Sequence, residues 1–237
     1  MTILRYLIAA LIGYLLGCSN MAYYIARSKG LDIHQIGTGN PGASNAMMSL
    51  GWKVGILVGL HDIGKAFVAV LLCKTLFPAL PYAPVAAGTA CVLGHLFPFY
   101  LRFRGGKGFA STYGMILGLD WRVALILGVL IILVVLLTDY IVAGTVTAVV
   151  GYPIYCLCTR QLVAAALTGA VAVVILLKHR ENFTRILNGT EVGLRKAHRG
   201  EMRVDRETAD PDAGVPSQDG APSDSDPARE ENGKTER

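Results

Sequence analysis

Apolar residues dominate seven segments of the chain, and each segment ends in a short polar or glycine-rich connection. The segments are 3–26, 53–74, 82–100, 109–119, 122–138, 140–158 and 162–178. Several of them approach the ~20 apolar residues that an α-helix needs to cross a bilayer, whereas 109–119 is short. We therefore predict an all-α polytopic membrane protein with seven transmembrane helices, in which neighbouring helices support 109–119 as a tilted or broken span.

The composition agrees with this pattern and separates off a tail. The chain of 237 residues is 53% hydrophobic and only 16% charged, which is too apolar for an ordinary soluble domain. Residues 1–200 carry 17 Lys and Arg against six Asp and Glu, whereas 201–237 carry five against 11. The tail is also poor in aliphatic residues and so cannot bury a core. We predict a membrane domain over 1–199 and a disordered acidic tail over 200–237.

The positions of Lys and Arg predict the orientation. With seven spans and the N-terminus outside, the inner connections and the end of the membrane domain hold 12 cations, and the outer segments hold four. Positive charge gathers on the cytoplasmic side of membrane proteins. We therefore expect the N-terminus outside and the C-terminus in the cytoplasm, with the three polar stretches described next on the cytoplasmic face.

The first polar stretch is HLFPFYLRFRGGKGFAST, residues 95–112, with apolar sequence on both sides. Cations and glycines at the mouth of apolar helices favour a bound anion, because glycine lets backbone N–H groups approach it and Lys and Arg supply charge. The spacing is not that of a Walker A loop. The alternative is a basic loop that only sets topology. The candidate binding groups are His95, Arg104, Gly105, Gly106, Lys107 and Gly108.

The second stretch is DIHQIGTGNPGASN, residues 32–45, in which hydroxyl and amide side chains alternate with glycines. Such a run suits a backbone nest with donors aimed at oxyanions. The alternative is a turn-rich connector, since the same residues favour turns for local reasons. The candidate binding residues are Gly37, Thr38, Gly39, Asn40, Ser44 and Asn45.

The third stretch is HRENFTRILNGTE, residues 179–191, directly after the last apolar segment. If that helix continues, His179, Asn182 and Arg185 follow one another at i,i+3 spacing and share a face. An imidazole, an amide and a guanidinium in a row suit a phosphate and a hydroxyl bound together, and Glu191 closes the stretch. The alternative is an ordinary basic helix end, which the helix dipole favours.

One acid and one base lie inside a predicted span. Asp62 and Lys65 are three residues apart in HDIGK, a spacing that puts both on one helix face. Charged side chains within a membrane usually pair with each other. We expect a structural ion pair that fixes helix packing.

The three polar stretches resemble the bacterial acyl-phosphate:glycerol-3-phosphate acyltransferase family. The matching strings are D-I-H-x-x-G-T-G-N-P-G-A-S-N, G-H-L-F-P…F-R-G-G-K-G-F-A-S and H-R-E-N-x-x-R-I-L-N-G-T-E, within about residues 10–192. The resemblance implies transfer of a fatty acyl group from acyl phosphate to the 1-hydroxyl of glycerol 3-phosphate. The products are lysophosphatidic acid and inorganic phosphate, in the first step of phospholipid synthesis. It also implies seven helices in the bacterial inner membrane, a cytoplasmic active site and no covalent acyl-enzyme.

The resemblance also assigns residues. Lys107 matches the phosphate-binding lysine of the family, and His179 and Asn182 match a catalytic pair at the end of the last helix. His179 is the best candidate for a general base. Thr145 stands where the family has a hydroxyl residue in its sixth span, and Gly37 to Ser44 match its first glycine-rich loop.

Three places depart from the family pattern. Cys18, Ser19 and Asn20 follow Gly17 where many members have G-S-I-P, and His34 stands where many members have Arg. The departure that affects the acceptor is Met48, which replaces an Arg that is usual four residues after the Ser44 position. Either Arg104 or Arg185 holds glycerol 3-phosphate instead, or the chain is a divergent member with another acceptor.

Other classes of protein stay open or are disfavoured. A related enzyme with a different donor is possible, and a small transporter of an anionic solute is the non-enzymatic alternative, although no inverted repeat is visible. The sequence contains no cluster of carboxylates, cysteines or histidines at metal-ligand spacing and no basic surface with interleaved aromatic residues. We therefore expect no metal, no cofactor, no nucleic acid and no protein partner; the expected partners are the two substrates and the lipid bilayer.

Overall fold

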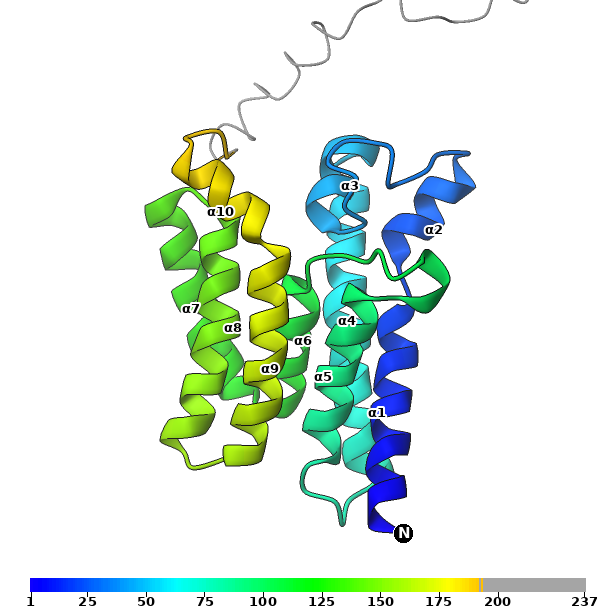
Figure 1. The fold of residues 1–237 in the computed structure, drawn as a ribbon, viewed down its shortest axis with the longest axis vertical. Coiled ribbons are helices and arrows are strands. Elements are labelled where there is room, and N and C mark those ends of the chain that lie inside the picture. Colours follow the sequence, from blue (N-terminus) through cyan, green and yellow to red (C-terminus); the bar gives the residue numbers. More distant parts are fainter. Residues whose placement is uncertain (192, 194–237) are drawn as a thin grey trace, which may run out of the picture. The chain divides into compact units, whose positions relative to one another are not determined.

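The computed structural model describes residues 1–191 and 193, and the predicted tail over 200–237 lies outside them. All regular structure in the described residues is helical (Figure 1). The helices are α1 Thr2–Cys18, α2 Met21–Ser28, α3 Ala43–Leu50, α4 Trp52–Leu76, α5 Ala83–Leu96, the 3-10 helix η1 Phe99–Leu101, α6 Phe109–Leu119, α7 Trp121–Thr138, α8 Ile141–Cys158, α9 Leu162–Lys178 and α10 Arg180–Leu187.

Each of the seven predicted apolar segments contains a helix, which confirms the all-α class. Among the described residues, five helical segments are long and apolar enough to cross a membrane, and a sixth is added if the bent pair α9 and α10 counts as one span. The short helix α6 has 11 residues and packs beside α4 and α5, so its neighbours support it as expected. The seven-span count and the orientation stay predictions.

The first apolar segment is one candidate span, Thr2–Ser28, as predicted, but a break divides it into α1 and α2. α1 ends at Cys18, and Asn20 caps α2 by accepting a hydrogen bond from the Tyr23 N–H at 2.8 Å. The break frees backbone carbonyls, which must find partners inside a membrane protein. The Tyr100 hydroxyl donates to the Cys18 carbonyl at 2.8 Å, and Lys65 Nζ donates to the Ser19 carbonyl at 2.7 Å.

Small residues allow α1 and α5 to pack closely. A Cβ atom added to Gly13 or Gly17 of α1 would collide with the carbonyl groups of Ala87 or Cys91 on α5. Close backbone approach through glycine is a common way for membrane helices to associate, because dispersion contacts replace the hydrophobic effect. α5 therefore has a fixed position against α1, and the loop that follows α5 starts from a rigid base.

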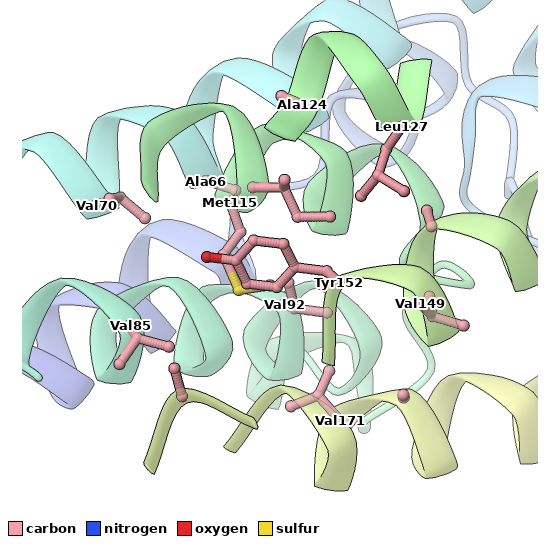
Figure 2. Close-up of a cluster of buried hydrophobic side chains, with 14 of the residues drawn as sticks. Ala66, Val70, Val85, Val92, Met115, Ala124, Leu127, Val149, Tyr152 and Val171 are labelled. Carbon is pink, nitrogen blue, oxygen red and sulfur yellow. The ribbon is translucent and has the colours of Figure 1, made fainter. Parts of the chain in front are cut away.

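The main apolar core lies between α4, α5, α6, α7, α8 and α9 (Figure 2). Met115 and Tyr152 meet at its centre with Val92 and Val171, and all four are buried. α2, α3 and α10 lie together at the end of the bundle opposite the N-terminus (Figure 1). The three polar stretches accompany these short helices, so the helical core presents them at one end.

Candidate functional site

A cavity of about 400 Å³ lies where the three polar stretches meet. Its lining comes from the 32–45 stretch, the loop after η1 and the junction of α9 with α10, which are far apart in the sequence. The lining residues are His34, Thr38, Gly39, Asn40, Pro41, Phe103, Arg104, Gly105, Lys107, Lys178, Glu181 and Arg185. The prediction that the three stretches lie on one face is therefore confirmed.

The charge of this lining is strongly positive. Arg104, Lys107, Lys178 and Arg185 are four cations, and Glu181 is the one carboxylate among the lining residues. The formal charge of these five side chains is +3. Like charges held together beside an apolar core are unfavourable unless an anion joins them. The cavity is thus suited to phosphate-bearing ligands.

Lys107 is held at the end of a hydrogen-bonded chain. Its Nζ donates to Asn182 Oδ1 in a short contact, and Asn182 Nδ2 donates to Glu191 Oε1 at 2.6 Å. Arg185 Nε donates to the other oxygen of Glu191 at 2.6 Å. Glu191 therefore does not line the cavity but orients the amide and the guanidinium that accompany Lys107. Such a network fixes side chains that would otherwise be flexible.

The environment changes the acidity of Lys107. Burial lowers the pKa of its ammonium below the usual lysine range, and the neighbouring Arg185 charge lowers it further, while Glu191 and Glu181 oppose the shift. Perturbed pKa values of this kind are typical of functional sites.

His179 lies at a bend, so the last apolar helix does not continue straight through the third polar stretch. α9 ends at Lys178 and α10 begins at Arg180, with an angle of 51° between the two helices. His179 is 5% exposed and is not among the residues that line the cavity, and its Nδ1 lies 2.9 Å from the Ile175 carbonyl. A carbonyl oxygen only accepts, so Nδ1 carries the proton and Nε2 is left as the acceptor. That tautomer is the one a general base requires.

Lys178 is a cavity residue that sequence reasoning counted only as a topological charge. Its Nζ donates to the Leu96 carbonyl at 3.1 Å and lies 4.6 Å from the centre of the Phe97 ring. Both partners belong to the end of α5, so Lys178 joins α9 to the start of the glycine loop. Its position directly before His179 was the only signal in the sequence.

Gly105 and Gly106, which follow η1, hold the loop against α5, whereas the sequence suggested that their N–H groups approach an anion. The N–H groups of Gly105 and Gly106 donate to the Leu96 and His95 carbonyls at 3.1 Å each, so α5 and not an anion receives them. A Cβ atom on Gly105 would collide with the His95 carbonyl, and one on Gly106 would collide with the His95 ring. Glycine is needed here because the loop lies directly on the end of α5. Gly108 caps α6 with a φ of 91°, a left-handed value that favours glycine.

The 32–45 stretch divides into lining and support. Thr38, Gly39 and Asn40 line the cavity, whereas Asn45 is 1% exposed beneath them. Asn45 Oδ1 accepts from the Thr38 N–H at 2.8 Å, and Asn45 Nδ2 donates to the Ile36 carbonyl at 3.1 Å. Asn45 thus holds the shape of the loop and does not face the ligand space.

Several other candidates do not line the cavity. Gly37 takes the left-handed φ of 57° that its turn needs, and Ser44 is exposed on α3. Thr145 is 2% exposed within α8. Met48 is 42% exposed and also lies outside the lining.

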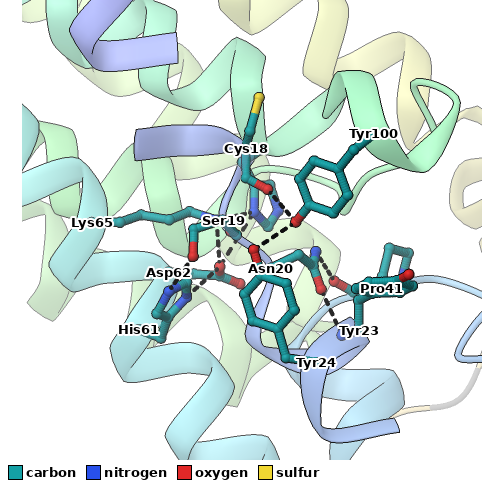
Figure 3. Close-up of polar contacts among 11 residues, drawn as sticks. Cys18, Ser19, Asn20, Tyr23, Tyr24, Pro41, His61, Asp62, Lys65 and Tyr100 are labelled. Carbon is teal, nitrogen blue, oxygen red and sulfur yellow. Dashed lines mark hydrogen bonds and ion pairs between the residues drawn. The ribbon is translucent and has the colours of Figure 1, made fainter. Parts of the chain in front are cut away.

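His95 belongs to a buried polar cluster, of which Figure 3 labels Ser19, His61, Asp62 and Lys65. The predicted ion pair is confirmed, with Lys65 Nζ 2.8 Å from Asp62 Oδ1. His95 joins this pair through Nδ1, which lies 2.9 Å from Lys65 Nζ. His95 is 4% exposed, so the structure does not bring it to the ligand space where the sequence suggested a binding role.

Fold and site together define a helical membrane protein with a polar, cationic cavity at one end of its bundle. Within the described residues no group of three or more His, Cys, Asp or Glu side chains is arranged to hold a metal ion. The Lys, Arg, amide and hydroxyl groups of the lining are of the kinds that position and neutralise phosphates.

Comparison with known proteins assigns the family. The family model described as glycerol-3-phosphate acyltransferase matches residues 7–189, and the chain belongs to this family. It is 36% identical over 198 residues to glycerol-3-phosphate acyltransferase 1 of Oceanobacillus iheyensis, covering 80% of this chain and 95% of that protein. It is also 36% identical to the glycerol-3-phosphate acyltransferase of Geobacter sulfurreducens over 189 residues, covering 79% and 97%.

Two crystal structures of PlsY (YgiH), an integral membrane glycerol 3-phosphate acyltransferase, share the fold. The glycerol 3-phosphate form has a TM-score of 0.75 at 30% identity and covers 81% of this chain and 97% of that one. The lysophosphatidic acid form has a TM-score of 0.71 at 31% identity and covers 79% and 94%. The chain therefore has the membrane fold of this acyltransferase.

Proposed function

We propose that this protein transfers a fatty acyl group from acyl phosphate to the 1-hydroxyl of glycerol 3-phosphate. The products are lysophosphatidic acid and inorganic phosphate. The observation that carries the proposal is the cavity with four cations and one carboxylate in its lining, in a chain of the glycerol-3-phosphate acyltransferase family. Its volume of about 400 Å³ is within the usual range for sites of small ligands.

The chemistry requires little from the protein beyond placement and charge. The hydroxyl oxygen of glycerol 3-phosphate attacks the acyl carbonyl carbon, the bond from that carbon to the phosphate oxygen breaks, and inorganic phosphate leaves. Acyl phosphate is already activated, so holding both phosphates in one cavity supplies proximity. Lys107 neutralises charge that develops on the leaving phosphate, and Asn182 keeps the Lys107 ammonium in place.

The hydroxyl proton needs an acceptor during the attack. We assign this role to His179, because its Nδ1 is engaged with the Ile175 carbonyl and its Nε2 is left to accept. The phosphate of the substrate is the other candidate acceptor. Thr38, Asn40 and Arg104 complete the set of groups that we propose to contact substrate, with Lys178 added to it on the basis of its place in the lining.

We further propose that the cavity faces the cytoplasm of a bacterial cell, with seven spans, the N-terminus outside and the protein in the inner membrane. Twelve cations on the polar side against four on the other support this orientation. The cavity then opens where soluble glycerol 3-phosphate is found, while the acyl chain of the donor stays in the bilayer.

A divergent acceptor is the second candidate. Met48 stands where the family resemblance leads us to expect an Arg, which removes one cation near the acceptor. Arg104, Lys178 and Arg185 are present in the lining and supply alternative contacts. The acceptor is therefore the part of the proposal that needs testing first.

The test is phosphate release from purified protein in lipid, given palmitoyl phosphate with and without glycerol 3-phosphate. We expect release that depends on glycerol 3-phosphate, with lysophosphatidic acid formed in equal amount. Release without that dependence keeps the donor and rejects the acceptor. No turnover by folded protein rejects acyl transfer, and uptake of labelled phosphate into protein-containing liposomes would then test an anion transporter.

A further inference from the structure

The Lys65 ammonium makes two hydrogen bonds and one ion pair within the protein. Nζ lies 2.8 Å from Asp62 Oδ1, 2.7 Å from the Ser19 carbonyl and 2.9 Å from His95 Nδ1. Asp62 and His95 are 2% and 4% exposed. A buried ammonium needs such partners, and here one opposite charge and two hydrogen-bond acceptors surround it. The cluster is shown in Figure 3.

The geometry of Lys65 determines the form of His95. A lysine ammonium only donates, so His95 Nδ1 accepts and carries no proton. The ring is then neutral, with its proton on Nε2. The 3.3 Å approach of His95 Nδ1 to Asp62 Oδ1 is in this arrangement a contact around the shared Lys65 and not a hydrogen bond. His61 extends the cluster, with Nε2 3.0 Å from Ser19 Oγ and Nδ1 3.5 Å from Asp62 Oδ1.

The other edge of the His95 ring faces the glycine loop. A Cβ atom on Gly106 would meet His95 Nε2 and the ring carbons next to it. The Gly106 N–H also donates to the His95 carbonyl at 3.1 Å. Gly106 is therefore fixed by both the backbone and the ring of His95, and Lys107 is the next residue in the chain.

We propose that His95 is a positioning residue for Lys107. Lys65 and Asp62 fix the His95 ring, and the ring fixes Gly106. Gly106 in turn sets the position from which the Lys107 side chain enters the cavity. The cluster also holds the Ser19 carbonyl at the break between α1 and α2. The Lys65 ammonium thus connects the break between α1 and α2, helix α4 and the end of α5 to the loop that carries Lys107.

The test rests on the proposed function and uses compensation of size in the full-length protein. Gly106→Ala pushes its new methyl group against the His95 ring and should displace Lys107, which we expect to lower kcat about 100-fold with little change in KM for palmitoyl phosphate. His95→Asn keeps an acceptor for Lys65 near the Nδ1 position and removes the far edge of the ring. In the His95→Asn background, Gly106→Ala should cost about threefold or less.

Gly105→Ala is the matched control. Its Cβ would collide with the His95 carbonyl and with Pro98, and both remain after His95→Asn. The loss caused by Gly105→Ala should therefore be the same in both backgrounds. Equal losses for Gly106→Ala in both backgrounds would overturn the positioning role, because a general loss of packing gives no such selectivity.

A second measurement does not depend on activity. ¹⁵N NMR of histidine-labelled protein in micelles distinguishes the two neutral tautomers and the imidazolium, with His95→Asn identifying the signals. We expect His95 to be neutral with the proton on Nε2 at pH 7, and Lys65→Met to abolish this preference. A proton on Nδ1 would overturn the inference. A protein without acyltransferase turnover that still gives the expected spectrum would reject the proposed function and leave the geometry of the cluster supported.

Discussion

Lys107→Ala is the substitution that tests the proposed reaction most directly. Lys107 lines the cavity and donates to Asn182. The substitution removes one of the four cations of the lining and leaves Asn182 bound to Glu191. The network beneath the cavity therefore stays in place, and the loss measured is that of the ammonium itself.

The magnitude follows from the charge that is removed. A unit charge about 4 Å from a phosphate oxygen is worth about 4 kcal/mol at an effective dielectric constant of about 20. Each ~1.4 kcal/mol of transition-state stabilisation is a factor of ten in rate, so the expected loss in kcat/KM is roughly 1,000-fold. Removal of a single oxyanion donor in other enzymes costs about 10²–10³ in kcat, which agrees.

The assay is phosphate release from palmitoyl phosphate at saturating glycerol 3-phosphate, with folding checked by thermal denaturation. Lys53→Ala is the matched control, because Lys53 is exposed at the start of α4, outside the lining, with its Nζ 5.9 Å from the Trp52 ring centre. It removes the same charge and should change the rate about twofold or less. A Lys107→Ala protein that is folded and within about threefold of the wild-type rate would refute the reasoning.

Three further predictions concern acidity, the acceptor and stability. Burial lowers the pKa of Lys107, so the ammonium and the rate that it supports are lost at a pH below the usual lysine range, and Glu191 opposes this shift. Glu191→Gln should therefore move the alkaline limb of the kcat/KM profile to lower pH. A move to higher pH contradicts the assignment. Met48→Arg should lower KM for glycerol 3-phosphate and leave KM for palmitoyl phosphate unchanged in initial-rate assays; no change means that the cations already present hold the acceptor. Asn20→Ala removes the cap of α2 and the 3.0 Å hydrogen bond from Asn20 Nδ2 to the Pro41 carbonyl. It should lower the free energy of unfolding by about 2 kcal/mol, measured by urea denaturation in micelles. A loss below about 0.5 kcal/mol would show that the cap is not needed.

The apolar pattern was sufficient to predict a helix in each of the seven apolar segments, because a membrane helix satisfies its own backbone hydrogen bonds and needs only length and hydrophobicity. It did not predict α3 and α10, which lie outside those segments. It failed at Asn20, where a single capping residue ends one helix and begins another within an apolar segment. The polar triplet Cys18–Asn20 was the available signal. Whether such a triplet breaks a helix depends on distant partners, here Lys65 and Tyr100, and no local pattern contains them.

The residue types that make up the candidate site were predictable from the sequence, but the positions and roles of individual residues were less so. Charge distribution placed the three polar stretches on one face, and the cavity confirms that they meet. The roles of individual residues depended on tertiary contacts. Asn45 and Glu191 support their neighbours and do not line the cavity, because their side chains are satisfied within the protein. Lys178 lines the cavity because α9 bends directly after it.

The charge of the cavity bears on how many phosphates it holds. A phosphate monoester carries about −1.5 to −2 at pH 7, so acyl phosphate and glycerol 3-phosphate together bring roughly twice that. Four cations against one carboxylate suit two such groups better than one, which favours a two-substrate reaction over passage of a single anion. The lack of an arginine at position 48, where this chain has Met48, then matters less than the total charge of the lining. Lys178 brings its own charge to the same cavity from α9. In this view all the cations around the acceptor together hold it. Removal of Lys178 or Arg185 should therefore mainly raise KM for glycerol 3-phosphate, whereas removal of Lys107 should mainly lower kcat.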